Sequence, residues 1–392
     1  MNKMPNRLLL SLMLMLALPC MLAAEKENYD KKKAAKEERE KKEALEKRLA
    51  EEQEIKARFG YSVNDITAHL VIVSCSGAQG RSSGSGFVAL LDGKPYLFTN
   101  QHVILGADTI SFKATAGGAL KPRGVELSTT RDIARLPLSE AEGLAISKNM
   151  AIGAPIAVFG NSEGGGVATE LYGKVTSVSA ELVEVSADFV SGNSGSPVLN
   201  LDKEVIGIAS YVSSSSDDED GSDTRRFCYR LTGNQWTSVD WKKYNDKFGK
   251  LYRDNEALVE ATFEVANQWY QDPFNRVSAD NHPDSELRKW STSHNHMVNR
   301  IMRMREQGTA TPHELENVNK QISKDLVDSS EDLAKVCRDR SKRLRMLAKQ
   351  RGLTGFLRDE FNRLSGRLES AARNLDAYGE KLAKFKFFHF AE

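Results

Sequence analysis

The sequence is poor in cysteine, in long apolar runs and in net charge. Four of its 392 residues are cysteines, and 55 Lys and Arg nearly balance 54 Asp and Glu. The one continuous apolar stretch, residues 8–18, is too short to span a bilayer comfortably. These absences argue against a multi-span membrane protein and against a strongly basic chain. What remains is the composition of a globular protein, longer than one ordinary domain, with one highly charged tract.

Residues that could hold a metal ion or contact nucleic acid form no recognisable motif. His294 and His296 are two positions apart, so on a helix they would face different sides, and no Cys or carboxylate frame surrounds them. The basic run from Arg338 to Arg345 has no nucleic-acid motif beside it and is typical of a solvated helix face. We therefore expect no metal, no small-molecule cofactor and no nucleic-acid partner.

The first residues, 1–24, have the features of a secretory signal. Lys3 and Arg7 give a basic start, the apolar stretch follows, and Ala23-Ala24 offers a small-residue exit. This pattern predicts a secreted or periplasmic protein. An uncleaved membrane anchor is one alternative, and a lipoprotein attached through Cys20 is another.

Three cysteines lie beyond that segment: Cys75, Cys228 and Cys337. An odd number leaves at least one thiol over in an oxidising compartment. Cys75 and Cys228 lie in separate predicted strands, so they could either pair or stay free.

Three further segments follow the signal, and their patterns differ. Residues 25–60 interleave Lys, Arg and Glu with few apolar positions, which predicts a solvated helical arm serving as a spacer, or alternatively as a coiled-coil or partner-binding element. Residues 61–240 show short apolar runs separated by Gly-rich or polar breaks, a pattern typical of an all-β sandwich or barrel. The runs are residues 70–73, 86–91, 96–98, 156–159 and 205–209.

Residues 241–392 instead repeat apolar side chains at helical spacing. The clearest stripe runs from Leu357 to Phe385 in alternating steps of three and four. A second stripe runs from Leu315 to Val336, and a third comprises Phe248, Leu251, Leu258, Val265 and Trp269. The pattern predicts about four amphipathic helices in an all-α bundle or coiled-coil hairpins. Such helices could stabilise the chain, join it into a homo-oligomer, or recruit a substrate.

A serine lies in a tight glycine-flanked turn, Gly192-Asn193-Ser194-Gly195-Ser196-Pro197. The glycines let the backbone fold closely, so the amides of Gly192 and Ser194 can point together at a developing oxyanion. A serine hydroxyl is a weak nucleophile, and it needs a base that is oriented by an acid. His102 and Asp132 supply these parts upstream. We interpret His102, Asp132 and Ser194 as a catalytic triad, with Asp108 as the alternative acid.

The order His, Asp, Ser and the surrounding residues indicate the architecture. An α/β-hydrolase would need Gly-x-Ser-x-Gly on a strand-to-helix elbow and another order of partners. The chain resembles the trypsin-like (chymotrypsin-fold) serine proteases, and among them the bacterial glutamyl endopeptidases and periplasmic Deg-type proteases. The likeness covers roughly residues 62–240 and is carried by Ser85-Gly86-Phe87, Thr99 to Val103, Asp132-Ile133-Ala134 and Gly192 to Pro197.

This resemblance implies two six-stranded antiparallel barrels with the triad in the cleft between them. It implies that His102 acts as general base and then acid, Asp132 orients it, and Ser194 is the nucleophile. The digestive members carry an Asp before the nucleophile that pairs with a new N-terminus, whereas this chain has Asn193. We therefore expect activity without that type of proteolytic activation. Deg-type proteases usually carry a β-rich peptide-binding module as well, and no such pattern follows here.

Residues that would line the specificity pocket also follow from the resemblance. They are Asp188, six residues before the nucleophile, and the strand Ser210-Tyr211-Val212. Val212 stands where deep-pocket members have glycine, so it would narrow the pocket and favour small or medium apolar residues before the scissile bond. Asp188 stands where trypsin carries its basic-selective aspartate, and the alternative is that it is a turn or surface residue.

The sequence thus predicts a multidomain chain: a charged helix, an all-β double-barrel protease domain, and an all-α C-terminal domain. It favours a serine endopeptidase that hydrolyses peptide bonds in protein or peptide substrates through an acyl-enzyme. The alternative is a non-catalytic scaffold that uses a protease-like domain and the helices to recognise a partner.

Overall fold

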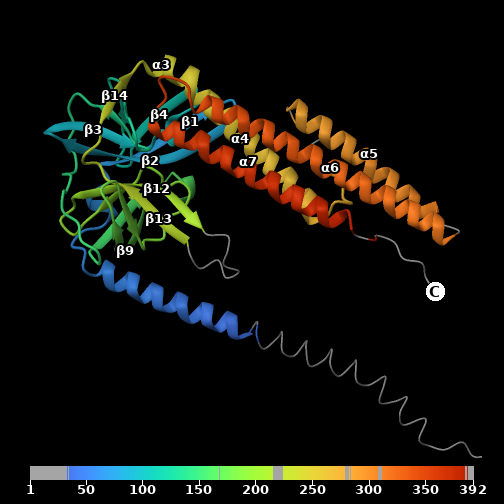
Figure 1. Cartoon of the computed structure of the whole chain (residues 1–392). Helices are drawn as coiled ribbons and strands as arrows, with labels where there is room; N and C mark the ends of the chain where they lie inside the picture. The colour runs from blue at the N-terminus through green and yellow to red at the C-terminus, as the bar shows by residue number, and fades with distance from the viewer. Residues whose placement is uncertain are drawn as a thin grey trace, which may run out of the picture.

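The computed structural model describes residues 33, 35–166, 168–214, 224–278, 282, 284–307, 311–384 and 386. Long helices project to one side of a β-rich part, and a separate helix, residues 35–56, leaves another edge of it (Figure 1). The proposed signal segment lies outside the described residues. The expected order of a charged helix, a β-barrel protease-like part and a helical region is therefore present.

The first half of the β-rich part is an eight-stranded antiparallel sheet in the order β14-β6-β7-β3-β2-β1-β4-β5. It differs from the six-stranded barrel that the resemblance implied, because β5 and β14 extend its two ends. The last strand comes from beyond the second half and returns to pair Trp236 with Ser128. The strands are β1 Leu70–Gly77, β2 Gly80–Leu91, β3 Lys94–Thr99, β4 Thr109–Ala114, β5 Ala119–Leu120, β6 Val125–Ser128, β7 Ala134–Pro137 and β14 Trp236–Val239.

The second half is a closed six-stranded barrel in the order β10-β13-β12-β11-β8-β9. Every residue of β8 is buried, because successive side chains point to opposite faces and both faces are covered. Ile156 and Val158 pack inside this barrel, whereas Ala157 and Phe159 pack with Phe87 of the first sheet. The strands are β8 Pro155–Gly160, β9 Thr169–Val178, β10 Leu182–Val185, β11 Pro197–Leu199, β12 Val205–Ser214 and β13 Thr224–Tyr229.

Four long helices follow, in agreement with the number that the apolar stripes predict. Thr311 and Thr354 cap two of them, each accepting a hydrogen bond from a first-turn amide. The helices are α4 Lys250–Gln271, α5 Ser285–Gln307, α6 Pro312–Leu347 and α7 Gly355–Leu382. The shorter elements are η1 Val63–Asp65, α2 Gln101–Ile104, η2 Ser162–Gly164, α3 Trp241–Tyr244 and the π-helical turn η3 Asn245–Gly249, which joins α3 to α4.

The apolar stripes of these helices match the sequence pattern unevenly. In α7 the described stripe is buried except at Tyr378, which is partly buried. In α4 the predicted stripe is partly wrong, because Leu251 and Leu258 are only half-buried and the neighbouring Tyr252 and Val259 are buried instead. The reason is that α4 packs against both α7 and α6, so its buried face is wider than a single seam.

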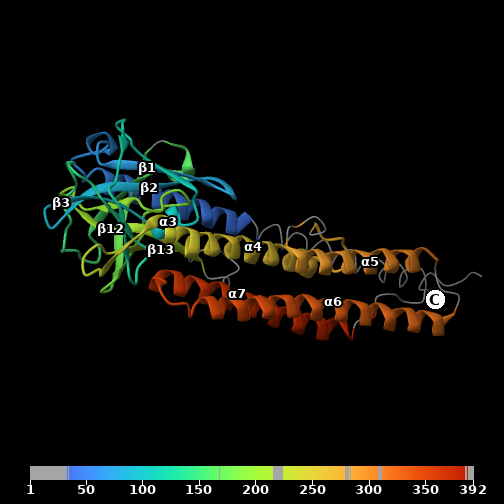
Figure 2. The ribbon, with the colours of Figure 1, turned by 90° about the horizontal axis from the view of Figure 1, so that it is seen from above.

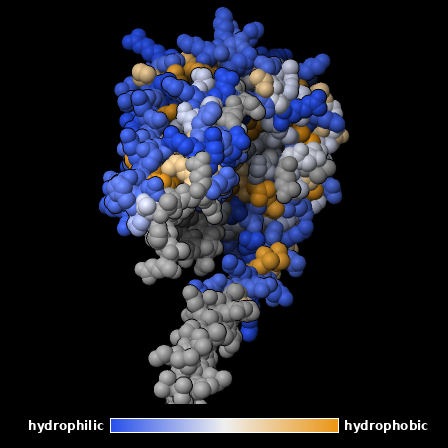
Figure 3. Space-filling view, turned by 90° about the vertical axis from the view of Figure 1, so that its right-hand side faces the viewer, coloured by the Kyte–Doolittle hydropathy of each residue, from blue (hydrophilic) through white to orange (hydrophobic). Residues whose placement is uncertain are grey.

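The helices and the first sheet share one hydrophobic core. A single cluster of buried side chains joins Val73 and Leu97 of the sheet, with Val103 of α2, to Phe248 and Leu357 of the helical region. The helices extend away from the sheet, with α4 beside α7 near the sheet and α5 beside the outer part of α6 (Figure 2). The face seen in Figure 3, from the side toward which they project, is mostly hydrophilic with scattered hydrophobic spots. The helical region therefore extends the core of the first sheet.

The charged helix is anchored to the second barrel at its end. Residues 35–50 are almost all exposed, as expected of a solvated arm. The last turns differ, because Ile55 is 3% exposed within the core and Glu51 lies 2.5 Å from Lys174 Nζ of β9. Glu52 Oε1 also accepts a hydrogen bond from the Tyr172 amide at 3.3 Å. The arm is therefore a docked element over its last two turns.

All three described cysteines are free and buried, so Cys75 and Cys228, whose pairing the sequence left open, do not form a disulfide. Cys75 lies in β1, where its thiol contacts the Val103 carbonyl at 3.2 Å, while Cys228 lies in β13 inside the other barrel. Burial raises the pKa of Cys75 to about 11. Across the residues described above, no helix has both the length and the apolar character needed to cross a membrane.

Replacing Leu364 by alanine tests the packing of the helical region. Leu364 in α7 is fully buried, so we expect Leu364→Ala to lower the free energy of unfolding by about 2–5 kcal/mol. The control is Met346→Ala, whose side chain is 64% exposed and whose loss should change stability by under about 0.5 kcal/mol. Urea denaturation measures both, and equal effects would contradict the packing described.

Candidate active site

His102 and Asp132 form a close pair at the edge of the first sheet. His102 lies in the single turn of α2, and its Nδ1 is 2.5 Å from Asp132 Oδ2. The His102 amide also donates to Asp132 Oδ1 at 3.0 Å, so the two carboxylate oxygens hold the ring and its backbone together. The alternative acid, Asp108, lies elsewhere: it is half-exposed and 2.9 Å from Lys250 Nζ.

The environment of the pair controls its charge. The Asp132 side chain is 5% exposed and the His102 side chain 27% exposed. Burial lowers the pKa of His102, but the charge of Asp132 and its hydrogen bond raise it, and the net direction is upward. Asp132 receives a further hydrogen bond from Ser210 Oγ at 3.0 Å. The Asp132 carboxylate is therefore buried, and both of its oxygens take part in hydrogen bonds.

Buried polar side chains beside His102 hold its segment against the loop that carries Asp132. Asn100 Nδ2 donates to the Asp132 carbonyl at 2.6 Å, and Gln101 Nε2 donates to the Arg131 carbonyl at 2.8 Å. The Arg131 guanidinium in turn donates to two backbone carbonyls of the loop before β14. Reasoning from the sequence missed Asn100, Gln101 and Arg131. Their only signal was their position directly beside the two triad candidates.

The turn that carries Ser194 depends on two glycines and on Ser85. Gly192 and Gly195 have φ values of +92° and +90°, which other residues rarely adopt. A Cβ on Gly195 would overlap the carbonyl oxygen of Ser85. Ser85 Oγ donates to the Gly192 carbonyl at 2.8 Å, and the Ser85 amide donates to the Ser194 carbonyl at 2.9 Å. Strand β2 of the first sheet therefore shapes a turn of the second barrel, and Ser85 was not identified as a site residue from sequence.

The Ser194 hydroxyl donates to the Ser210 carbonyl at 3.3 Å. Ser210 therefore links the parts of the site, because its hydroxyl binds Asp132 while its carbonyl binds Ser194. Among the described residues, Ser194 has no hydrogen bond with His102. Catalytic hydrogen bonds are often long or misaligned before a substrate binds, so this arrangement is compatible with a triad.

Asn193 is buried and stabilises the turn without a charge. Its Oδ1 accepts hydrogen bonds from the Val190 amide at 3.0 Å and from Ser162 Oγ at 3.2 Å. The Asn193 Oδ1 is therefore satisfied by two donors, whereas its Nδ2 is buried without a hydrogen-bond partner among the described residues. Within the described part of the chain, the amides of Gly192 and Ser194 have no protein acceptor.

The residues predicted to select substrate lie in different environments. Asp188 does not stand alone, because its carboxylate pairs with Arg226 of β13 and lies 2.8 Å from Arg48 of the N-terminal helix. Val212 is 44% exposed and stands directly opposite Arg226 in the ladder of β12 and β13. Tyr211 stacks on Phe227 with 5.0 Å between ring centroids. Two arginines thus neutralise the one acid that could have attracted a basic side chain.

A family model described as a trypsin-like peptidase domain matches residues 84–208. This stretch begins within β2 and ends within β12, and it contains the His102, Asp132 and Ser194 positions. The chain therefore contains a trypsin-like peptidase domain, as the sequence motifs predicted.

Curated relatives share this part of the chain. A probable periplasmic serine endoprotease, DegP-like, from Halomonas elongata is 34% identical over 152 residues, which are 35% of this chain and 32% of the relative. A serine protease Do-like HtrA from Lactobacillus helveticus is 26% identical and overlaps 40% of this chain and 42% of its own. The chain thus spans 32% and 42% of the lengths of these two relatives.

The matches to solved structures are partial as well. The serine endoprotease from Yersinia pestis is 24% identical, with a TM-score of 0.35, covering 43% of this chain and 60% of its own. An active-form protease from M. tuberculosis is 20% identical, with a TM-score of 0.36, covering 43% and 78%. The described helical region lies beyond the residues that the family model matches.

Titration of His102 tests the geometry of the pair without any enzyme assay. In the Ser194→Ala chain we expect the ring to titrate above the range of an unperturbed histidine, because Asp132 stabilises its protonated form. Adding Asp132→Asn removes that charge while the burial remains, so the pKa should fall. NMR of the ring protons measures both values, and an unmoved titration in the double variant would contradict the pairing.

Proposed function

We propose that the chain is a serine endopeptidase that cleaves peptide bonds through an acyl-enzyme. The observation that carries the proposal is that Ser210 connects the three candidate residues. Its hydroxyl binds Asp132, which in turn binds His102, and its carbonyl accepts a hydrogen bond from Ser194. The trypsin-like domain match over the same residues supports it. In this proposal the eight-stranded sheet and the closed barrel act as the two halves of a cleft-forming double barrel.

The first half-reaction begins when substrate draws the Ser194 hydroxyl from the Ser210 carbonyl. Asp132 holds the proton on Nδ1 of His102, which leaves Nε2 as the basic nitrogen. Ser194 Oγ then bonds to the carbonyl carbon of the substrate while its proton passes to Nε2. The amides of Gly192 and Ser194 donate to the resulting oxyanion, since no protein acceptor occupies them among the described residues. His102 returns the proton to the leaving amine as the peptide bond breaks.

The second half-reaction releases the acyl group. A water molecule attacks the ester carbon, and His102 accepts a proton from that water. The bond to Ser194 Oγ breaks, and the proton moves from His102 to the serine oxygen, which restores the resting site. Asp132 stabilises the imidazolium in both halves without itself gaining a proton.

The substrates in this proposal are proteins or peptides, and the location is secreted or periplasmic. The signal-like residues 1–24 support export, and the names of the DegP-like relatives include the periplasm. We divide the chain into a signal peptide at 1–24, a charged helical arm at 25–60, a protease domain at 61–240 and a helical domain at 241–392. If the chain forms a homo-oligomer, we assign the contact between copies to the coiled-coil-like helices of this last domain.

The paired state of Asp188 supports a preference for uncharged residues before the scissile bond. Its carboxylate is already neutralised by Arg226 and Arg48. The half-exposed Val212 on the neighbouring strand would narrow the specificity pocket. Small or medium apolar side chains therefore fit this pocket best. In this assignment Ser210, Tyr211 and Val212 form the wall that faces the substrate.

Widening that wall tests the assignment. We expect the intact chain to prefer alanine or valine before the scissile bond, and Val212→Gly to shift the ratio of kcat/KM toward phenylalanine by about tenfold. Profiling with a peptide library measures the ratio. A strong preference for Arg or Lys in the unchanged chain would refute the small-apolar pocket.

A serine-reactive probe separates catalysis from the scaffold alternative. We expect a fluorophosphonate to label the intact chain at one position, because only an activated serine attacks it readily. Ser194→Ala should abolish labelling, whereas Ser238→Ala, on the remote strand β14, should leave it unchanged. Mass spectrometry of the labelled peptide identifies the site. Intact chain that takes up no probe would favour a non-catalytic scaffold.

A further inference from the structure

The loop that carries His102 is held from behind by the start of the helical region. Asn245, in the π-helical turn, accepts a hydrogen bond from the Gly106 amide at 2.7 Å and donates to the Ala107 carbonyl at 2.8 Å. The two backbones approach so closely that a Cβ on Gly249 would lie 2.8 Å from the Gly106 nitrogen. The turn after α2 is therefore seated directly on the junction of α3 and α4.

Arg253 of α4 reaches through this contact to the histidine itself. Its Nη2 donates to the carbonyl of His102, and its Nε donates to the Leu105 carbonyl at 3.0 Å. These are carbonyls at the end of a single helical turn, which lack intrahelical partners and need other donors. A Cβ on Gly106 would overlap the Arg253 side chain, so the glycine provides the passage for it.

The guanidinium is itself held in place from the helical side. Its Nη1 donates to Glu256 Oε2 at 2.7 Å, and Glu256 Oε1 accepts from the Tyr252 hydroxyl at 2.9 Å. The Tyr252 hydroxyl lies 3.3 Å from Glu360 Oε2 of α7. A planar guanidinium that donates from all three of its nitrogens orients its partners more firmly than a flexible ammonium does.

A second contact joins the helical region to the Asp132 side of the site. Thr354, the cap of α7, donates from Oγ1 to Gln101 Oε1 at 3.0 Å, and the Gly355 amide donates to the Thr129 carbonyl at 2.6 Å. Gln101 precedes His102, and Thr129 lies on the loop that leads to Asp132. Both loops that supply the base and its acid are thus tied to helices beyond the matched peptidase domain.

We propose that Arg253 is a positioning residue for His102, so that the helical region is a working part of the active site. This inference rests on the proposed function for its catalytic consequence. It gives α4 and α7 a role that the sequence left open: they fix the backbone around the general base. Removing the Arg253 contacts should loosen α2 and misalign the imidazole, and misplacement of about 1 Å at a catalytic group can cost on the order of 100-fold in rate.

The charges that face His102 give this role an electrostatic signature. Burial lowers the pKa of His102, Asp132 raises it, Arg253 lowers it and Glu256 raises it. Loss of the Arg253 charge should therefore raise the pKa of His102. Since the base must be neutral to accept a proton, the acid limb of the kcat/KM profile should move to higher pH. A purely structural contact would not shift it in that direction.

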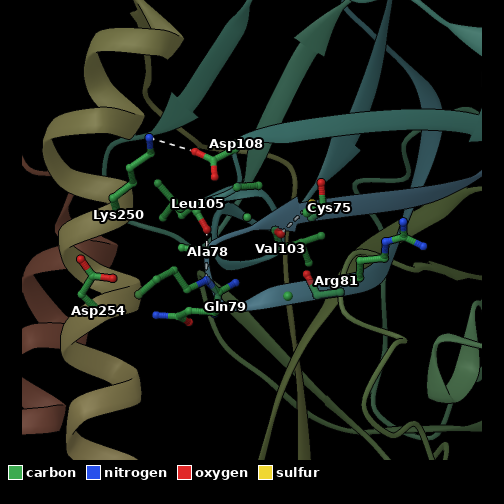
Figure 4. A pocket seen from close by; sticks show the side chains of 16 residues that line it. Cys75, Ala78, Gln79, Arg81, Val103, Leu105, Asp108, Lys250 and Asp254 are labelled. Atoms are coloured by element: carbon green, nitrogen blue, oxygen red, sulfur yellow. Dashed lines mark hydrogen bonds and ion pairs between the residues drawn. The ribbon is translucent and has the colours of Figure 1, made fainter. Parts of the chain in front are cut away.

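The surroundings of Arg253 offer both a rescue experiment and a matched control. Arg253 lines a cavity of about 310 Å³ between α4 and the first sheet, with Cys75, Arg81 and Asp254 also on its walls (Figure 4). A free guanidinium ion is small enough to enter such a space when the side chain is removed. On the same helix, Lys250 extends to Asp108, as Figure 4 shows, and makes an exposed ion pair that does not touch α2.

The experiment compares four variants of the full chain: Arg253→Ala, Arg253→Gln, Arg253→Lys and Lys250→Met. We expect Arg253→Ala to lose tenfold or more in kcat/KM on a peptide substrate and to regain part of it in millimolar guanidinium chloride. Arg253→Gln should move the acid limb to higher pH, while Arg253→Lys keeps the charge and the wild-type limb but loses part of kcat. Lys250→Met should stay within about twofold of the intact chain, since an exposed ion pair contributes little.

Titration of His102 in the Ser194→Ala background keeps the test independent of activity. In that background, Arg253→Gln should raise the pKa of His102 and Arg253→Lys should not. If the alanine and glutamine variants fail to fold, the loss of kcat at an unchanged acid limb in Arg253→Lys tests the positioning role. The proposal is overturned if all variants match the intact chain, or if Arg253→Gln and Lys250→Met lose activity and thermal stability equally. An intact chain that rejects the fluorophosphonate would instead refute the proposed function and leave the titration as the test of Arg253.

Discussion

The arrangement of the site depends on the hydrogen bonds between Asp132 and His102. The carboxylate binds both the ring and the backbone amide of the histidine, so it sets the ring's tautomer and the position of α2 together. A buried carboxylate is costly unless its oxygens are hydrogen-bonded, and Ser210 supplies the additional donor from β12 of the second barrel. Docking of the barrel onto the sheet therefore completes the hydrogen bonding of the pair.

The same constraint explains why so much of the chain converges on the three short segments that carry His102, Asp132 and Ser194. Ser85 of β2 shapes the Ser194 turn, Arg131 joins the Asp132 loop to the segment before β14, and Arg253 joins α2 to the helices. Each of these side chains satisfies carbonyls that have no strand or helix partner. Irregular backbone beside a reactive centre needs such donors, because loops do not supply their own. The helical region thereby becomes continuous with the core under the site.

Much of the fold was predictable from local patterns, and the failures were long-range. Short apolar runs predicted the strands, and the Leu357 stripe predicted α7, because period and capping act over a few residues. The α4 stripe was displaced by one residue at Leu251 and Leu258, since the width of its buried face depends on neighbours far along the chain. Whether Cys75 and Cys228 pair stayed open for the same reason: the sequence does not reveal that the two thiols, which are free in the structure, lie in different halves.

The sequence by itself determined which residues could form a triad, in what order, and that strands precede helices, because those signals lie in short motifs and periodicities. Only the tertiary structure decided that Asp132 and not Asp108 meets His102, that two arginines neutralise Asp188, and that Arg253 reaches the histidine carbonyl. These contacts join positions 30 to 151 residues apart, where no local pattern exists. They arise when hydrophobic burial brings the sheet, barrel and helices together and their buried polar groups must find partners.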